Sequence, residues 1–144
     1  MRILAIDFGE KRCGLAVTDK LQIIATPLEA IPTANLLAYL ENYAQKESLS
    51  AIVIGKPLHL DNTQTDIIPT IQRFIQRIKA KFPHIPIYWV DERFTSKMAV
   101  QAMIQAGSKK KQRQKKENLD KISASLILQT FLEQKNNGAS LELA

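Results

Sequence analysis

Two acidic residues follow apolar runs at places where a carboxylate could do chemistry. Asp7 comes directly after the apolar run at 3–6, and Glu92 comes soon after the run at 85–90. Short, continuous apolar runs are typical of strands that are buried on both faces. Because sites in open α/β sheets collect beyond the carboxyl ends of the strands, both acids are candidate site residues. Each could equally be a turn residue, since Asp is common there, so the pair alone is not specific.

Asp120 is a third candidate, and helical geometry singles it out. At about 100° per residue, it lies within about 20° of Ile127 and Phe131 on a predicted helix. The carboxylate is therefore expected on an inward, apolar face, where an uncompensated charge is strongly disfavoured. A basic side chain, hydrogen bonds or a cation would have to compensate it. The alternative is an Asp near the helix N-terminus, stabilised by the helix macrodipole.

The three acids together predict a particular chemistry. Small residues at Ser123 and Ala124 should let this helix approach the sheet closely, so that Asp120 meets Asp7 and Glu92. Converging carboxylates without a His or Cys cluster suit a hard, oxygen-preferring cation such as Mg²⁺ or Mn²⁺. Two such ions about 4 Å apart can activate water and stabilise the leaving oxygen in phosphodiester hydrolysis. If the three acids converge, they are candidate metal ligands and catalytic residues, with Asp120 argued most directly from the helical geometry.

The net charge of +6 comes from one segment. Residues 109–116 read KKKQRQKK, and without these six basic residues the chain has 14 basic and 14 acidic residues. A run of this density repels itself until a polyanion neutralises it, which predicts contact with nucleic-acid phosphates. The alternative is a solvated loop that aids solubility. The residues concerned are Lys109, Lys110, Lys111, Arg113, Lys115 and Lys116.

Length and composition fit one globular domain. The chain has 144 residues, of which 45% are apolar and 24% charged. No apolar stretch approaches the roughly 18 residues of a membrane span, and the run at 3–6 is too short for a signal peptide. Cys13 is the only cysteine, which excludes an intrachain disulfide and a multi-cysteine zinc site. We expect a cytoplasmic protein without a membrane partner; the sequence does not indicate its oligomeric state.

The order of apolar patterns predicts the elements that position the acids. Strands are expected at residues 3–6, 15–17, 22–26, 51–54 and 85–90. A first helix is expected to begin near Thr33, which would be its N-cap. A second should carry the apolar stripe at 67–82 and start either at Pro69 or at Asn62 or Thr63, and two more should span 96–106 and 117–133. This order predicts one α/β domain over 1–135. Its mixed five-stranded sheet is a three-strand meander followed by βαβα units, with helices on both faces and a frayed tail at 136–144.

Four segments of the chain together resemble one family. They are IDFGEKRCGLAVTD (6–19), VIGKPLHLDNT (53–63), VDERFTS (90–96) and LDKISASLILQTFL (119–132). In this order they resemble the YqgF family, whose members are described as Holliday-junction resolvases and as pre-16S ribosomal RNA nucleases. The resemblance runs from residue 1 to about 133. It implies a ribonuclease H-like fold.

The resemblance also implies roles for individual residues. The family's acids fall on Asp7, Glu92 and Asp120, which implies that they bind magnesium or manganese for phosphodiester cleavage. Lys11, Arg12 and Arg93 would then lie near the site, on phosphates or on the carboxylates; ordinary turn or surface ion pairs are the alternative.

The function expected from these observations is a metal-dependent endonuclease acting on structured nucleic acid. The resemblance names two substrates, the 5′ end of pre-16S rRNA during ribosome biogenesis and Holliday-junction-like DNA, and nothing in the sequence separates DNA from RNA. One alternative is a non-catalytic ribosome-assembly or transcription factor on the same fold. A nucleotide phosphotransferase is another, although it would need a second lobe that 144 residues do not provide.

Overall fold

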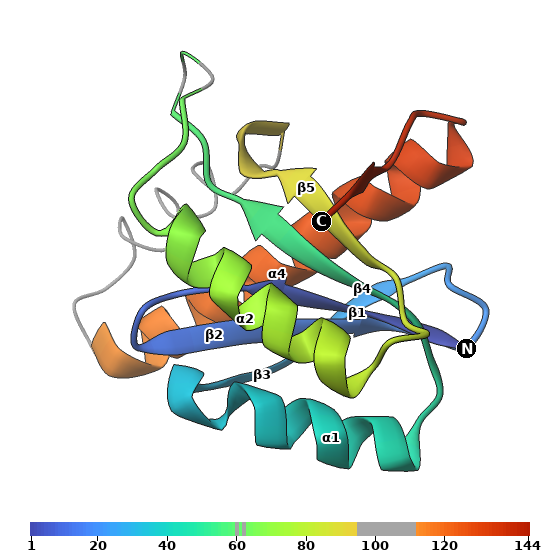
Figure 1. The fold of residues 1–144 in the computed structure, drawn as a ribbon, viewed down its shortest axis with the longest axis horizontal. Helices are drawn as coiled ribbons and strands as arrows, with labels where there is room; N and C mark the ends of the chain where they lie inside the picture. The colour runs from blue at the N-terminus through green and yellow to red at the C-terminus, as the bar shows by residue number, and fades with distance from the viewer. Residues whose placement is uncertain (60, 62, 95–111) are drawn as a thin grey trace.

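A six-stranded mixed sheet forms the centre of the computed structural model, which describes residues 1–59, 61, 63–94 and 112–144 (Figure 1). The strands are β1 (Arg2–Asp7), β2 (Arg12–Thr18), β3 (Ala25–Pro32), β4 (Leu49–Lys56), β5 (Ile87–Asp91) and β6 (Glu142–Leu143). The α-helices are α1 (Leu36–Lys46), α2 (Ile68–Lys81) and α4 (Gln112–Asn136), and short 3-10 helices span Thr33–Asn35 and Glu92–Phe94. Across the described residues, no helix combines the length and apolarity needed to span a membrane.

The sheet has the predicted meander at its start. Strands β1, β2 and β3 pair antiparallel in sequence order, and β4 and β5 then continue the sheet parallel to β1. The strand order is β3-β2-β1-β4-β5-β6. The carboxyl ends of β1, β4 and β5 therefore lie at the same edge, which is where the sequence placed the candidate acids.

Side chains alternate between two cores, one on each face of the sheet. Leu4 and Ile6 of β1 belong to the core under α1 and α2, whereas Ile3 and Ala5 belong to the core under α4. Figure 1 shows α1 and α2 on one side of the sheet and α4 on the other. This alternation follows from the period of two along a strand, and it confirms helices on both faces.

The sixth strand corrects the expectation of five strands. Residues 142–143, expected to fray with the rest of the tail, pair antiparallel with β5 through Tyr88↔Leu143 and Trp89↔Glu142. The Glu142 carboxylate also accepts a 2.8 Å hydrogen bond from Lys56 Nζ. A strand at the edge of a sheet has backbone N–H and C=O groups without partners, and the tail pairs with some of these groups of β5.

The third strand begins later than predicted because its first residues form a turn. One Asp19 carboxylate oxygen accepts hydrogen bonds from the backbone N–H groups of Ile23 and Ile24, both at 2.8 Å. Gln22 adopts a left-handed conformation with φ 59°. An Asp side chain that binds the following N–H groups favours a turn over a strand, so β3 starts at Ala25 rather than at residue 22.

The predicted helix starts were partly wrong. Thr33 does not cap α1: its hydroxyl donates a 2.7 Å hydrogen bond to the Gly9 carbonyl, and α1 begins at Leu36 after a 3-10 turn. Pro69 lies in the first turn of α2, which is one of the two starts that the sequence allowed.

Helix α4 begins at Gln112, about five residues before the predicted start, and ends at Asn136. Its first turns consist of Gln, Arg, Lys and Glu, which are good helix formers, and no Gly or Pro interrupts them. The backbone of Arg113, Lys115 and Lys116 is thus helical rather than part of a loop. Lys109, Lys110, Lys111 and the helix predicted at 96–106 lie outside the described residues.

Candidate active site

Asp7 is the last residue of β1 and is the most buried of the three candidate acids. Its position alternates with Ile3 and Ala5, so it belongs to the face of the sheet that α4 covers. Only 7% of its surface is exposed. A carboxylate at this depth needs hydrogen bonds or an opposite charge to offset its lost hydration.

Gly14 lies beside Asp7 in the sheet and contacts the backbone of Asp120. It is the cross-strand partner of Asp7 on β2, and a Cβ at Gly14 would collide with the backbone of Asp120. The start of α4 therefore rests directly on β2, one strand away from Asp7. Burial is the main cause that raises the pKa of the Cys13 thiol. Hydrogen bonds with Thr33 and Gly9 oppose this rise, and the negative charges of Asp7 and Asp120 add to it. Both acids thus lie within electrostatic reach of the same side chain.

Gly55 lies beside Asp7 in the sheet and close to the Glu92 side chain. Ile6 and Ile54 are partners in the parallel β1–β4 pair, so Asp7 and Gly55 follow side by side. A Cβ at Gly55 would lie 2.5 Å from Glu92 Oε1. The Glu92 carboxylate consequently lies over β4, in the space that a side chain at this position would fill, and on the side of the sheet where Asp7 ends β1.

The structure places Asp7, Glu92 and Asp120 around one end of the face that α4 covers. Their burial differs from the prediction, because Asp120 is not enclosed: 26% of its side chain is exposed, and it forms an ion pair with Arg12 Nε at 3.5 Å. Asp120 precedes the fully covered stretch of α4, so only one side of it faces the sheet. Within the described part of the chain, no three His, Cys, Asp or Glu side chains stand close enough to hold a metal ion as they are.

Arg93 is held by an acid outside the candidate triad. Its guanidinium forms an ion pair with Asp91, with Nη2 to Oδ2 at 2.5 Å and Nε to Oδ1 at 3.0 Å. The hydrogen bond from Arg93 lowers the pKa of the Asp91 carboxyl. Arg93 Nη1 also donates to the backbone oxygen of His59 at 3.3 Å. These contacts favour the local ion pair, which was one of the two interpretations of Arg93.

The structure also describes the two other basic residues that were expected near the site, Arg12 and Lys11. Arg12 begins β2 and lies beside Asp120, a contact that fits both interpretations of this residue. Lys11 is exposed in the turn before β2, while its backbone oxygen accepts a 2.9 Å hydrogen bond from Thr33.

Sequence reasoning missed the part played by Gly14 and Gly55. Each lies in a paired strand, at a point where another group occupies the space of a side chain. A glycine within a strand is the available signal, because it often marks a close approach of another backbone or ligand.

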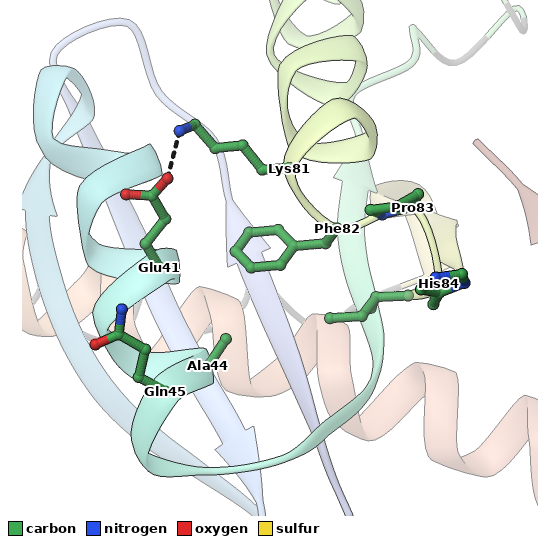
Figure 2. Close-up of a pocket in the computed structure, with 8 residues that line it drawn as sticks. Glu41, Ala44, Gln45, Lys81, Phe82, Pro83 and His84 are labelled. Atoms are coloured by element: carbon green, nitrogen blue, oxygen red, sulfur yellow. Dashed lines mark hydrogen bonds and ion pairs between the residues drawn. The ribbon is translucent and has the colours of Figure 1, made fainter.

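A groove at the opposite end of the sheet lies away from these acids. Figure 2 shows it between α1 and the end of α2, with Glu41 and Lys81 joined by an ion pair above Phe82 and His84. Residues 81–85 precede β5, whereas Glu92 follows it. The groove is therefore separate from the candidate active site.

Comparison with known proteins places this arrangement in a family. The family model described as "RuvX: Holliday junction resolvase" matches residues 1–134. The chain belongs to this family. Its members are nucleases, so the chain is a hydrolase acting on ester bonds. This confirms the resemblance seen in the four sequence segments.

Relatives within the family are similar over nearly their whole length. A protein of Phocaeicola vulgatus is 48% identical over 134 residues, which cover 93% of this chain and 96% of the relative. A protein of Bacteroides thetaiotaomicron is 47% identical over 134 residues, covering 93% and 97%. Both bear the name "Putative pre-16S rRNA nuclease".

Solved structures agree on the fold. Thermus thermophilus RuvC in complex with a Holliday junction substrate superposes with a TM-score of 0.63 at 14% identity, covering 100% of both chains. Thermus thermophilus RuvC alone gives 0.62 at 15% identity, with the same coverage. The ribonuclease H-like fold is therefore confirmed.

Proposed function

We propose that the chain is a Mg²⁺- or Mn²⁺-dependent endonuclease that cuts structured nucleic acid. The observation that supports the proposal is that Asp7, Glu92 and Asp120, from separate parts of the chain, lie around one end of the α4 face. Gly14 brings Asp120 to β2, and Gly55 leaves room for Glu92 on β4, on either side of Asp7. Carboxylates at a partly buried point need hydrogen bonds or opposite charge, and a bound cation would add to the positive charge that Arg12 brings to Asp120.

The residues present suit such a cation by their chemistry. Asp7, Glu92 and Asp120 offer only carboxylate oxygens, the donors that Mg²⁺ and Mn²⁺ prefer. These three residues would hold the metal, with two ions as the expected number. When bound, the metal supplies an activated water and neutralises charge on the leaving oxygen.

The remaining groups at this end of the sheet bind and orient the substrate. Arg12, ion-paired with Asp120 and 28% exposed, can contact a phosphate next to the acids. Lys11 lies one residue before it, in the same exposed turn. The basic segment 109–116 includes the first residues of α4, the helix that carries Asp120, and would extend the phosphate contacts along the nucleic acid.

The substrate that we propose is the precursor of 16S rRNA, cut at its 5′ end during ribosome biogenesis in the cytoplasm. Relatives at 46–48% identity carry the name of such a nuclease. The family description names a second substrate, the four-way DNA junction. Because phosphate contacts do not distinguish DNA from RNA, the two substrates have to be separated by experiment.

Single-turnover cleavage tests the proposal. Purified protein would be given a labelled pre-16S rRNA fragment, a DNA four-way junction and a linear DNA duplex, each with Mn²⁺ or with EDTA. We expect Mn²⁺-dependent cleavage of the rRNA fragment near the mature 5′ end, and loss of about 100-fold or more in rate in the Asp7→Asn protein.

Two outcomes would contradict the proposal. Cleavage that persists in EDTA, or that is unchanged in Asp7→Asn, would exclude the metal mechanism. Binding without cleavage of any of the three substrates would instead favour a non-catalytic assembly factor. Faster cleavage of the junction than of the rRNA would keep the mechanism and change the substrate.

A further inference from the structure

Ser123 of α4 carries a buried hydroxyl that the protein itself does not satisfy. The residue is 1% exposed, and among the described residues its Oγ is the only buried side-chain oxygen or nitrogen without a hydrogen-bond partner. A buried hydroxyl without a partner destabilises the folded state, because its lost hydration is not replaced. A serine in a helix can bond to a carbonyl of the preceding turn, as Ser125 does to the Ile122 oxygen at 2.7 Å. Ser123 does not, so its hydroxyl is available for another partner.

The two ends of this stretch of α4 define where Ser123 lies. At one end, the backbone of Asp120 rests on Gly14 of β2. At the other end, Ile127 Cδ1 would be 2.7 Å from a Cβ at Gly55 of β4. The helix thus crosses from β2 toward β4 over β1, which lies between them in the sheet.

Ser123 lies between these two contacts on the same side of the helix. It is three residues after Asp120 and four before Ile127, and residues with these spacings are neighbours on one helix face. Asp7 ends β1 between Gly14 and Gly55. The Ser123 side chain is therefore on the part of α4 that covers the end of β1, next to the candidate acids.

We infer that Ser123 is a positioning residue of the acidic site, whose hydroxyl hydrogen-bonds to the water shell of the cation held by Asp7, Glu92 and Asp120. The inference rests on the proposed function. A hydroxyl can donate one hydrogen bond and accept two, so it can orient a metal-bound water. Alanine would fill the same space without an unpaired group, as Ala124 does on the same helix. Serine at this position is thus explained by a bond that forms when the cation binds.

Calorimetric titration with Mn²⁺, combined with thermal unfolding in EDTA, tests the inference. The proteins compared are wild type, Ser123→Ala, Ser125→Ala and Asp7→Asn. In EDTA, Ser123→Ala should unfold at the wild-type temperature or above it, because an unpaired buried hydroxyl is removed. Its Mn²⁺ affinity should nevertheless fall roughly 10-fold, as expected when a group that orients metal-bound water is lost. Ser125→Ala, with a side chain bonded within its own helix, should bind Mn²⁺ as wild type does.

The possible results separate this inference from the proposed function. If wild type binds Mn²⁺, Asp7→Asn does not, and Ser123→Ala binds as wild type, the metal site stands and the role of Ser123 is overturned. If Ser123→Ala is clearly less stable than wild type in EDTA, the hydroxyl has a structural role and the inference also fails. If wild type itself does not bind Mn²⁺, both the metal site and the inference fall.

Discussion

Gly14 and Gly55 let the acids of the site approach one another because neither has a side chain. The groups that occupy the vacated space differ: at Gly14 it is the backbone of Asp120, and at Gly55 it is mainly the Glu92 side chain. A backbone can give way only if the whole helix moves, whereas a glutamate can rotate. The two glycines should therefore respond differently to the same substitution.

Gly55→Ala should reduce cleavage more than stability, since it displaces Glu92 from its position over β4. We expect a loss of about 1 kcal/mol in the free energy of unfolding, at the low end for overpacking. Gly14→Ala should cost about 3 kcal/mol or more, since α4 must lift from β2. Urea unfolding and single-turnover cleavage of both variants measure the two effects. Equal stability losses would contradict the different contacts.

Arg12→Gln should affect nucleic-acid binding more than folding. The ion pair with Asp120 is partly exposed, and such pairs contribute about 0–1 kcal/mol to stability. If Arg12 contacts a phosphate, the slope of log K against log salt should fall by about one. Arg73→Gln is the matched control, because Arg73 lies on α2, on the other face of the sheet. An unchanged slope in Arg12→Gln would mean that Arg12 serves only the ion pair.

The conformation of the turn between β2 and β3 depends on the carboxylate of Asp19. Asp19 accepts backbone hydrogen bonds from Ile24, Ile23 and Leu21, and these lower the pKa of its carboxyl below the ordinary value of 3.8. A lowered pKa in the folded state means that the carboxylate stabilises the fold above the unfolded-state pKa. That stabilisation is lost as the pH falls through the folded-state value.

Asp19→Ala should therefore destabilise the protein more at pH 7 than at about pH 3 or below. Asp19→Asn is the control: its amide oxygen can accept the same N–H groups but does not titrate, so its effect should change little with pH. Urea unfolding at both pH values measures the differences. A destabilisation by Asp19→Ala that grows toward acid would contradict the hydrogen-bonded turn.

The elements also show which features the sequence could predict. Continuous apolar runs predicted β1, β4 and β5, and helical stripes predicted α2 and the main part of α4, because burial itself imposes those patterns. The start of β3 and the pairing of β6 were missed. The first depends on one Asp side chain, and the second on an open sheet edge contributed by distant residues. Neither leaves a periodic pattern.

The candidate site was predictable to a similar degree. Strand ends indicated Asp7 and Glu92, and helical spacing indicated Asp120. Glycines within strands could have indicated close approaches at Gly14 and Gly55, but which groups approach them, and where Ser123 lies, depends on how α4 crosses the sheet. The partial exposure of Asp120 has the same origin.

At the scale of the whole molecule, charge is unevenly distributed along a chain whose remainder is neutral. Replacing the six basic residues of 109–116 by Gln should weaken nucleic-acid binding. It should also reduce the salt slope by as much as about five, at roughly 0.9 per phosphate contact. The cleavage rate at saturating substrate should stay within about twofold, since the acids are intact.

The matched control replaces Arg73, Arg77, Lys79 and Lys81 by Gln. These residues lie on α2, on the face of the sheet opposite α4. Fluorescence anisotropy across a salt series compares the two variants. Because the control removes four charges and the variant six, equal losses of affinity per charge removed would mean that net charge, rather than this segment, attracts the nucleic acid.

The location of bound Mn²⁺ shows whether the three acids form a metal site, and anomalous diffraction from crystals grown with Mn²⁺ would measure it. We predict a peak within about 2.0–2.4 Å of carboxylate oxygens from at least two of Asp7, Glu92 and Asp120. No peak should appear there in the Asp7→Asn protein. Mn²⁺ bound only elsewhere on the chain, or an unchanged peak in Asp7→Asn, would contradict a metal site built from these three acids.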